Sequence, residues 1–256
     1  MKKYALLIAT ISGILSFSCS KDEDYLFPDT IMNEMELKAV NHSVYGTDSI
    51  IYTDNKVSNI RSYKIQNGAI LLDISYRFEY ADDEITIHAI RRGFDEDIYT
   101  LSFSESGIKT IRSSSGTIDI TFYYNEKRQP VYFLYHRMSS SKNIMVDSIS
   151  VAYDEKQSNI TGMTWYRKAA GVPDESVFSF AYTHDDKRNP YSGSVYYLAC
   201  AWQGPDEIIS YFNRNNITSI GKHRLTYGYD SNNYPVFMDV NMFGRTTFFY
   251  QEKSVN

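Results

Sequence analysis

The stretch YRFEYADDEITI, residues 76–87, predicts a β-hairpin. Apolar residues alternate with polar ones on both sides of its centre, which is the pattern of two half-buried strands. The polar segment between them favours a turn, because aspartate side chains hydrogen-bond the nearby backbone. The unit is therefore a strand that ends in an aromatic residue, Tyr80, followed by a turn and a returning strand with β-branched residues.

The same aromatic-then-turn unit recurs along the chain. Its other centres are Tyr52, Phe103, Tyr124, Tyr153, Tyr182, Tyr211 and Tyr229. From Tyr124 onward, successive centres are 29, 29, 29 and 18 residues apart. An internal period of this size indicates an architecture built from repeated supersecondary units. Helical periodicity is nearly absent. Residues 204–212 are the exception, because Pro205 followed by two acids is a helix start signal.

One unit carries a resemblance to known sequences. The stretch LTYGYDSNNYPV, residues 225–236, resembles YD-type repeats, in which Tyr-x-Tyr-Asp precedes a turn. With the N-terminal features described below, the chain resembles Bacteroidetes surface lipoproteins of unknown function that have a porin-like β fold. The resemblance covers most of residues 45 to 250. It implies a fold, and it brings no activity and no catalytic residues.

These features predict an all-β fold with a single repeat-built domain over residues 43–256. We expect an antiparallel meander of hairpins that forms a curled open sheet or barrel-like roll, soluble rather than membrane-spanning. A transmembrane barrel is the alternative, since its strands also alternate and carry many aromatic residues. Arg77 and Glu79 share one strand face, which favours a solvated face over a lipid-facing one.

The N-terminus has the pattern of an export signal. Lys2 and Lys3 precede an apolar stretch that is too short to span a bilayer. The following SFSC, residues 16–19, resembles a bacterial lipobox, which implies that Cys19 is lipidated and becomes the mature N-terminus. We therefore expect a signal peptide over residues 1–18 and a lipidated, flexible tether over residues 19–42. The pattern also allows a short helix over residues 33–40.

Short motifs after Cys19 concern location and modification. The stretch Ser20, Lys21, Asp22, Glu23 and Asp24 resembles the surface-export signal of Bacteroidetes lipoproteins. It favours an outer-membrane protein that faces the cell exterior, with a periplasm-facing lipoprotein as the alternative. Asp-Ser/Thr-apolar triplets make Thr30, Ser49 and Ser148 candidate O-glycosylation sites.

Charge and cysteine content exclude some classes of protein. The formal net charge is -5, and removal of Lys2 and Lys3 with the signal peptide makes it -7. Nucleic acid is not an expected partner, because its binding requires a basic face. Cys200 is the one cysteine left beside Cys19, so the fold does not depend on an internal disulfide.

Catalytic motifs are not found in the sequence. Its five histidines form no spaced ligand pair, and the cluster His184-Asp185-Asp186 is expected in a solvated loop. No nucleophile elbow or phosphate loop occurs. We therefore predict no cofactor and no metal. An enzyme is not favoured, although a carboxylate-dependent hydrolase stays an alternative because its acids need only proximity.

Two tryptophans are candidate ligand-binding residues, because an aromatic face can stack on a sugar. Trp202 is the better candidate, since it ends an apolar run beside a loop, and Trp165 is the second. The first hypothesis is a noncatalytic surface module that binds a glycan or a partner protein. A structural or assembly protein that pairs through sheet edges is the alternative from another class.

Overall fold

The structure is a computed structural model of the 256-residue chain. It describes residues 35–43, 46–138, 144–156, 158–169, 176–194, 205–240 and 244–252. Several sequence predictions lie outside these residues: Cys19, the export stretch 20–24, Thr30, Cys200 and Trp202.

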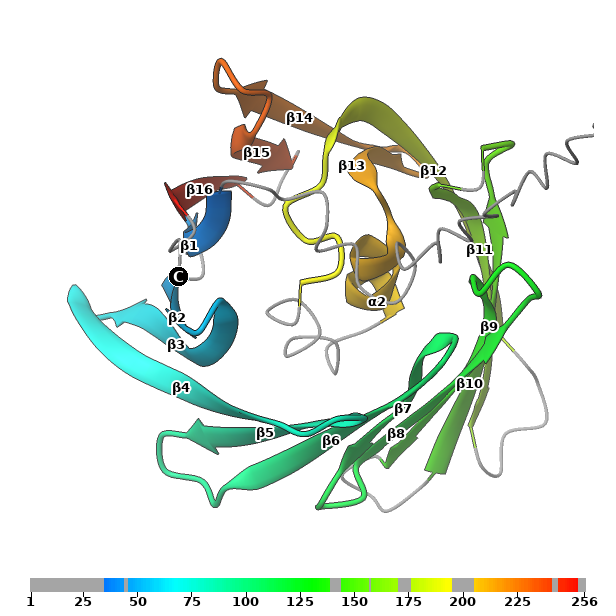
Figure 1. Cartoon of the computed structure of the whole chain (residues 1–256), viewed down its shortest axis with the longest axis horizontal. Helices are drawn as coiled ribbons and strands as arrows, with labels where there is room; N and C mark the ends of the chain where they lie inside the picture. The colour runs from blue at the N-terminus through cyan, green and yellow to red at the C-terminus, as the bar shows by residue number, and fades with distance from the viewer. Residues whose placement is uncertain are drawn as a thin grey trace, which may run out of the picture.

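Sixteen antiparallel strands form a closed barrel in which every strand pairs with its neighbour in the chain (Figure 1). Their bounds are β1 Met35–His42, β2 Gly46–Thr53, β3 Lys56–Gln66, β4 Ala69–Tyr80, β5 Glu84–Arg91, β6 Asp97–Ser104, β7 Gly107–Ser113, β8 Ile118–Tyr124, β9 Pro130–Met138, β10 Ile144–Tyr153, β11 Ile160–Ala169, β12 Ser176–Arg188, β13 Asn215–Ile220, β14 His223–Tyr229, β15 Pro235–Val240 and β16 Gly244–Glu252. Within the described residues one helix, α2, spans Pro205–Phe212, where the sequence predicted a helix over residues 204–212.

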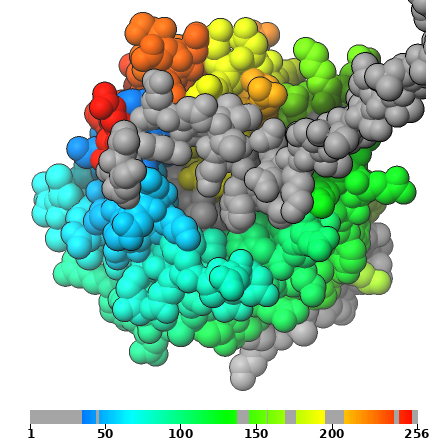
Figure 2. Space-filling view, viewed as in Figure 1, coloured from blue at the N-terminus to red at the C-terminus, as the bar shows by residue number. Residues whose placement is uncertain are grey.

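Closure of the sheet contradicts the predicted fold class in part. The all-β antiparallel meander is confirmed, but the curled open sheet or barrel-like roll is wrong, because β1 pairs with β16 from Met35 with Glu252 to His42 with Thr246 and closes the barrel. Figure 2 shows the red C-terminal residues directly against the blue N-terminal ones. The short helix allowed over residues 33–40 is also wrong. Residues 35–42 form the strand that closes the barrel, so the β domain includes Met35 and does not begin at residue 43.

The apolar face of the wall points inward. Phe78, Ile87 and Ile120 belong to a continuous buried core together with Ile208 of α2. Figure 1 shows α2 inside the ring of strands. A barrel of this size is too wide for its wall side chains alone to fill, so an element within it is needed to cover the apolar face.

The outward face carries charged pairs. Arg77 and Glu79 are 58% and 57% exposed and form an ion pair at 3.2 Å between Nη2 and Oε1. Arg112 with Asp119 is a second such pair. In the described part of the chain, no helix has the length and apolar character to cross a membrane.

Six tyrosines, of which four are predicted repeat centres, form a tyrosine girdle at one end of the barrel. Each girdle tyrosine lies near the end of an even-numbered strand, and its hydroxyl donates to a backbone carbonyl near the start of the preceding strand. The six bonds are Tyr52 to Leu37 (2.9 Å), Tyr80 to Val57 (2.8 Å), Tyr124 to Ile108 (2.7 Å), Tyr153 to Pro130 (3.0 Å), Tyr227 to Ile217 (3.0 Å) and Tyr250 to Pro235 (2.9 Å). Four of the eight predicted centres, Tyr52, Tyr80, Tyr124 and Tyr153, make this bond. The others do not: Tyr182 donates to Met163 Sδ, Tyr211 lies in α2, Tyr229 donates to Asp185, and Phe103 has no hydroxyl. We call this the girdle end and the opposite one the far end.

A glycine makes room for one of these contacts. Gly107 begins β7 with φ +123°, and a Cβ atom there would lie 3.0 Å from the Tyr124 hydroxyl oxygen. Both the backbone conformation and the close approach of the ring favour glycine at this position.

Candidate functional site

The inside of the barrel is tied to its wall near the girdle end. Asn189 Nδ2 donates to the carbonyl oxygens of Ser210 (2.7 Å) and Asn213 (2.9 Å), and so satisfies carbonyls at the C-terminal end of α2. The Asn213 side chain accepts from the Ile160 backbone N–H at 2.6 Å. Asn189 and Asn213 are 5% and 0% exposed. These contacts hold the helix in place, so this part of the lumen is structural.

Trp165 points into the lumen from β11, but one of its faces is already covered. The Arg167 guanidinium lies 4.2 Å above the indole ring, and Phe178 contacts the ring at 5.6 Å between centroids. Arg167 Nε donates to Asp147 Oδ1 at 3.1 Å, and this carboxylate is fully buried. Within the described residues, Trp165 Nε1 has no hydrogen-bond partner. The indole face under Arg167 is therefore not free to stack on a sugar.

The two described O-glycosylation candidates lie within paired strands. Ser49 of β2 is opposite Arg61, and Ser148 of β10 is opposite Tyr166. Both follow the outward-facing register, since Ile50 and Ile149 next to them are buried in the core. Modification at either serine stays a prediction.

The His184-Asp185-Asp186 segment is part of β12, so its placement in a solvated loop is wrong. Asp185 accepts hydrogen bonds from the Tyr229 hydroxyl and from Asn216 Nδ2. Burial raises the pKa of Tyr229, and the hydrogen bond to Asp185 raises it further. Burial lowers the pKa of His184. No group of three or more His, Cys, Asp or Glu residues that could hold a metal ion is found within the described ranges.

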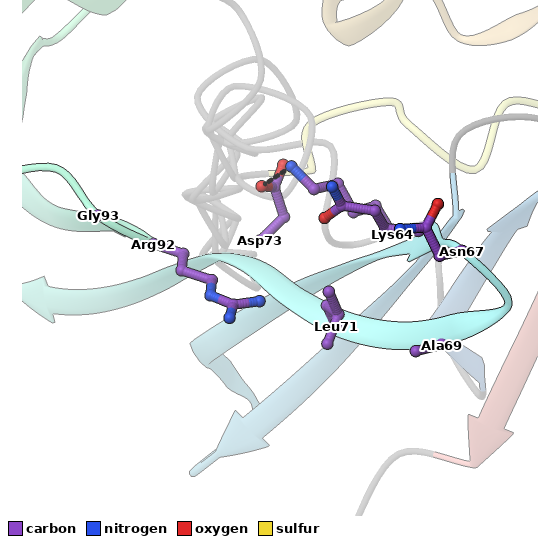
Figure 3. A pocket seen from close by; sticks show the side chains of 8 residues that line it. Lys64, Asn67, Ala69, Leu71, Asp73, Arg92 and Gly93 are labelled. Carbon is purple, nitrogen blue, oxygen red and sulfur yellow. Dashed lines mark hydrogen bonds and ion pairs between the residues drawn. The ribbon is translucent and has the colours of Figure 1, made fainter.

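A hollow of about 640 Å³ lies at the far end, on the inner face of the hairpin formed by β3 and β4 (Figure 3). We call it the β3–β4 hollow. Asn67 and Gly68 form the hairpin tip with φ values of +53° and +77°, as a tight two-residue turn requires. The lining residues are Lys64, Gln66, Asn67, Ala69, Leu71, Asp73, Arg92 and Gly93.

Two of the three charged groups in the hollow neutralise each other. Lys64 Nζ lies 2.6 Å from Asp73 Oδ1. The Arg92 backbone N–H donates to the Asp73 carbonyl oxygen at 2.9 Å, which fixes the end of β5 against β4. Among the described residues, no ion pair or hydrogen bond involves the Arg92 side chain. The hollow is within the size range of small-molecule sites.

Sequence reasoning missed this hollow for a clear reason. The sequence signals for a sugar site or a catalytic site are aromatic faces and spaced motifs, whereas the lining consists of amide, charged and small apolar side chains. Residues 64–73 and residues 92–93 become neighbours through the register of β3, β4 and β5. The strongest available signal was Asn67-Gly68, which marks the hairpin tip but not a binding site.

Comparison with known proteins supports the fold. No protein-family model matches the chain, and no curated protein matches it. A porin-like protein from Bacteroides vulgatus, known from its crystal structure, has a TM-score of 0.54 and 13% identity over 84% of this chain and 98% of its own. One from Bacteroides uniformis has a TM-score of 0.53 and 12% identity over 86% and 97%. At this identity the likeness concerns the fold, and the chain therefore shares the porin-like barrel fold of these two proteins.

Proposed function

We propose that the protein is a lipid-anchored outer-membrane protein that faces the cell exterior and binds a glycan noncatalytically in the β3–β4 hollow. The lipobox-like SFSC and the acidic stretch after Cys19 support the anchor and its direction. The porin-like neighbours from Bacteroides support an outer-membrane location.

The lining of the hollow is the observation that carries the binding role. Gln66 and Asn67 offer amide donors and acceptors, and the charged side chains add further donors and acceptors. Leu71 and Ala69 provide an apolar floor in the same hollow. A sugar requires this combination, because its hydroxyls form hydrogen bonds while the C–H face of its ring packs on apolar atoms.

The two alternatives have less support. Closure of the barrel removes the free sheet edges on which the assembly alternative depends. A hydrolase would need two carboxylates in one cleft. The buried carboxylates of the described residues are Glu36 and Asp147, which lie on non-neighbouring strands and are bonded to Gln251 and Arg167.

Anchoring is tested by fractionation of cells that express Cys19→Ala. The wild-type protein should label with radioactive palmitate and sediment with outer membranes, and external protease should remove it from intact cells. The variant should lose the label and leave the membrane fraction. Membrane sedimentation of Cys19→Ala equal to wild type would contradict the anchor, and full protection of the wild type would contradict the outward direction.

Binding is tested by affinity electrophoresis of the mature chain through gels that contain different polysaccharides. We expect one or more glycans to retard the protein, and Gln66→Ala to reduce the retardation. Arg61→Ala is the matched control, because Arg61 lies on the same strand but on its outward face. If no glycan retards the protein, a partner protein becomes the better ligand class, and crosslinking on whole cells would identify it.

A further inference from the structure

We propose that the β3–β4 hollow selects anionic glycans and that Arg92 is the residue that binds their carboxylate or sulfate groups. This inference rests on the proposed function, because it names the substrate class of the same site. Its basis is the arrangement of charge within the hollow.

Arg92 supplies the uncompensated charge. Among the lining residues, Lys64 and Arg92 are cationic and Asp73 is anionic, so the hollow carries one net positive charge. The 2.6 Å contact between Lys64 and Asp73 pairs one cation with the one acid. The Arg92 side chain has no such partner in the described part of the chain. An anionic ligand would therefore meet a guanidinium that no protein carboxylate occupies.

The position of Arg92 is fixed by its backbone. Its N–H is bonded to the Asp73 carbonyl oxygen, and the Phe94 N–H is bonded to the Arg91 carbonyl oxygen at 3.0 Å. Gly93 completes this turn with φ +80°. Figure 3 shows the Arg92 side chain beside Leu71, from the neighbouring strand of the same sheet. The backbone of Arg92 is thus fixed, and its guanidinium offers paired donors that match the geometry of a carboxylate or a sulfate.

Nearby acids are mostly engaged elsewhere. After Arg92 the chain continues through Asp95, Glu96 and Asp97. Glu96 Oε1 lies 3.0 Å from His88 Nδ1, and Asp97 accepts from Ser114 at 3.1 Å. Asp95 has no bonded partner among the described residues, so it is the acid that could oppose an incoming anion. Substitution of Asp95 therefore changes the charge near the hollow while Arg92 is kept.

The test measures affinity electrophoresis of the full mature chain with three probes: polygalacturonate, dextran sulfate and neutral dextran. We expect one of the two anionic polymers to retard the protein, with an effect that falls as salt increases. Retardation by polygalacturonate would indicate a carboxylate ligand, and retardation by dextran sulfate would indicate a sulfate ligand. Arg92→Gln should weaken binding at least tenfold, whereas Arg61→Gln should not. Asp95→Asn should leave binding unchanged or strengthen it.

Each contrary outcome has a distinct meaning. Equal retardation by neutral dextran would overturn the selection for anions and leave the glycan-binding function standing. Binding of an anionic polymer that Arg92→Gln does not weaken would overturn the role of Arg92. Retardation by no glycan of any charge would overturn the proposed function itself. Circular dichroism and thermal unfolding of each variant establish that it is folded before its binding is compared.

Discussion

At the residue scale, the six girdle tyrosines link neighbouring strands at one end of the barrel. Each of the six places a hydroxyl where it satisfies a carbonyl near a strand start, and an unsatisfied buried carbonyl costs about 1–3 kcal/mol. Burial raises the pKa of Tyr124, Tyr153 and Tyr250 well above the ordinary value of about 10. These hydroxyls are therefore protonated donors throughout the physiological range.

The first prediction concerns alkaline pH. Because the folded protein holds these protons more tightly than the unfolded chain, the stability they contribute is complete below about pH 10 and is lost as pH rises above it. Tyr124→Phe removes one such hydroxyl and its 2.7 Å bond. We expect its free energy of unfolding at pH 8 to fall by about 1 kcal/mol.

Denaturant titrations between pH 8 and 11 check this prediction. Wild-type stability should decline above pH 10, and the decline should be shallower in Tyr124→Phe because one titrating group is missing. Tyr123→Phe is the control, since Tyr123 directly precedes Tyr124 on the same strand and its side chain is 47% exposed. Identical pH slopes for wild type and Tyr124→Phe would contradict the assignment.

Single residues were predictable in type but not in role. The aromatic-then-turn pattern was visible, yet the carbonyl partner of each tyrosine lies on another strand and depends on register. The same limit applies to Trp165. The sequence shows that Trp165 has an aromatic face that could stack on a ligand. It does not show that the Arg167 guanidinium covers this face, because that contact depends on both side chains pointing to the same side of β11.

At the element scale, α2 depends on one asparagine for much of its attachment. Asn189→Ala removes the donor to two carbonyl oxygens at the end of the helix and the acceptor of the Tyr191 N–H. We expect the free energy of unfolding to fall by about 2 kcal/mol or more, because these groups are buried. Amide hydrogen exchange in α2 should accelerate while exchange in β5–β8 is unchanged.

A matched variant separates this effect from the general loss of an amide side chain. Asn232→Ala removes an exposed asparagine in the turn between β14 and β15, so exchange in α2 should stay at the wild-type rate. Protection of α2 that is equal in Asn189→Ala and wild type would show that other contacts hold the helix.

A second element depends on glycine. A Cβ at Gly228 of β14 would lie 2.1 Å from Phe237 Cε1, and Arg245 lies 4.1 Å over the same Phe237 ring. Gly228→Ala must displace this ring, so we expect a loss of about 1–3 kcal/mol. Gly162→Ala is the control because its nearest neighbours would be at 3.8 Å.

Thermal and denaturant unfolding of both glycine variants tests this prediction. Gly162→Ala should change the free energy of unfolding by less than about 1 kcal/mol. If Gly228→Ala is equally neutral, the packing of Phe237 on β14 does not constrain that strand. A double variant with Phe237→Ala should recover part of the loss, because the ring that clashes is gone.

Elements were the most predictable level. Alternation identified most of the hairpins, and Pro205 with its acids identified α2. The hairpin units predicted at Tyr182 and Tyr211 are wrong, because β12 runs through Tyr182 and Tyr211 lies in α2. The wrong predictions at Met35–His42 and at His184–Asp186 have one cause: both segments contain polar residues that are typical of a tether or a loop. They form strands because their partners, β16 and β13, supply the hydrogen bonds.

At the whole-molecule scale, closure was not predictable. It depends on the number of strands and on the stagger between them, which no local pattern encodes. The fold also orients the proposed site. Residues 19–34 precede β1, which starts at the girdle end, and such a segment reaches at most about 3.6 Å per residue. The girdle end is therefore the end at which the N-terminal segment joins the barrel, and the β3–β4 hollow lies at the opposite end.

The pairing of β1 with β16 has a consequence for biogenesis. The first strand has no partner on one side until the last has formed, so the ring cannot close before β16 has been synthesised. Deletion of residues 244–256 should leave β1 and β15 with bare edges, and we expect assemblies larger than a monomer in size-exclusion chromatography. A monomeric product that unfolds cooperatively would contradict this view.

Met35 and Glu252 are paired residues of β1 and β16, so the two ends of the barrel sequence lie side by side. A circular permutant that joins these ends and has new termini in the turn at Asn67-Gly68 should therefore fold to the same ring.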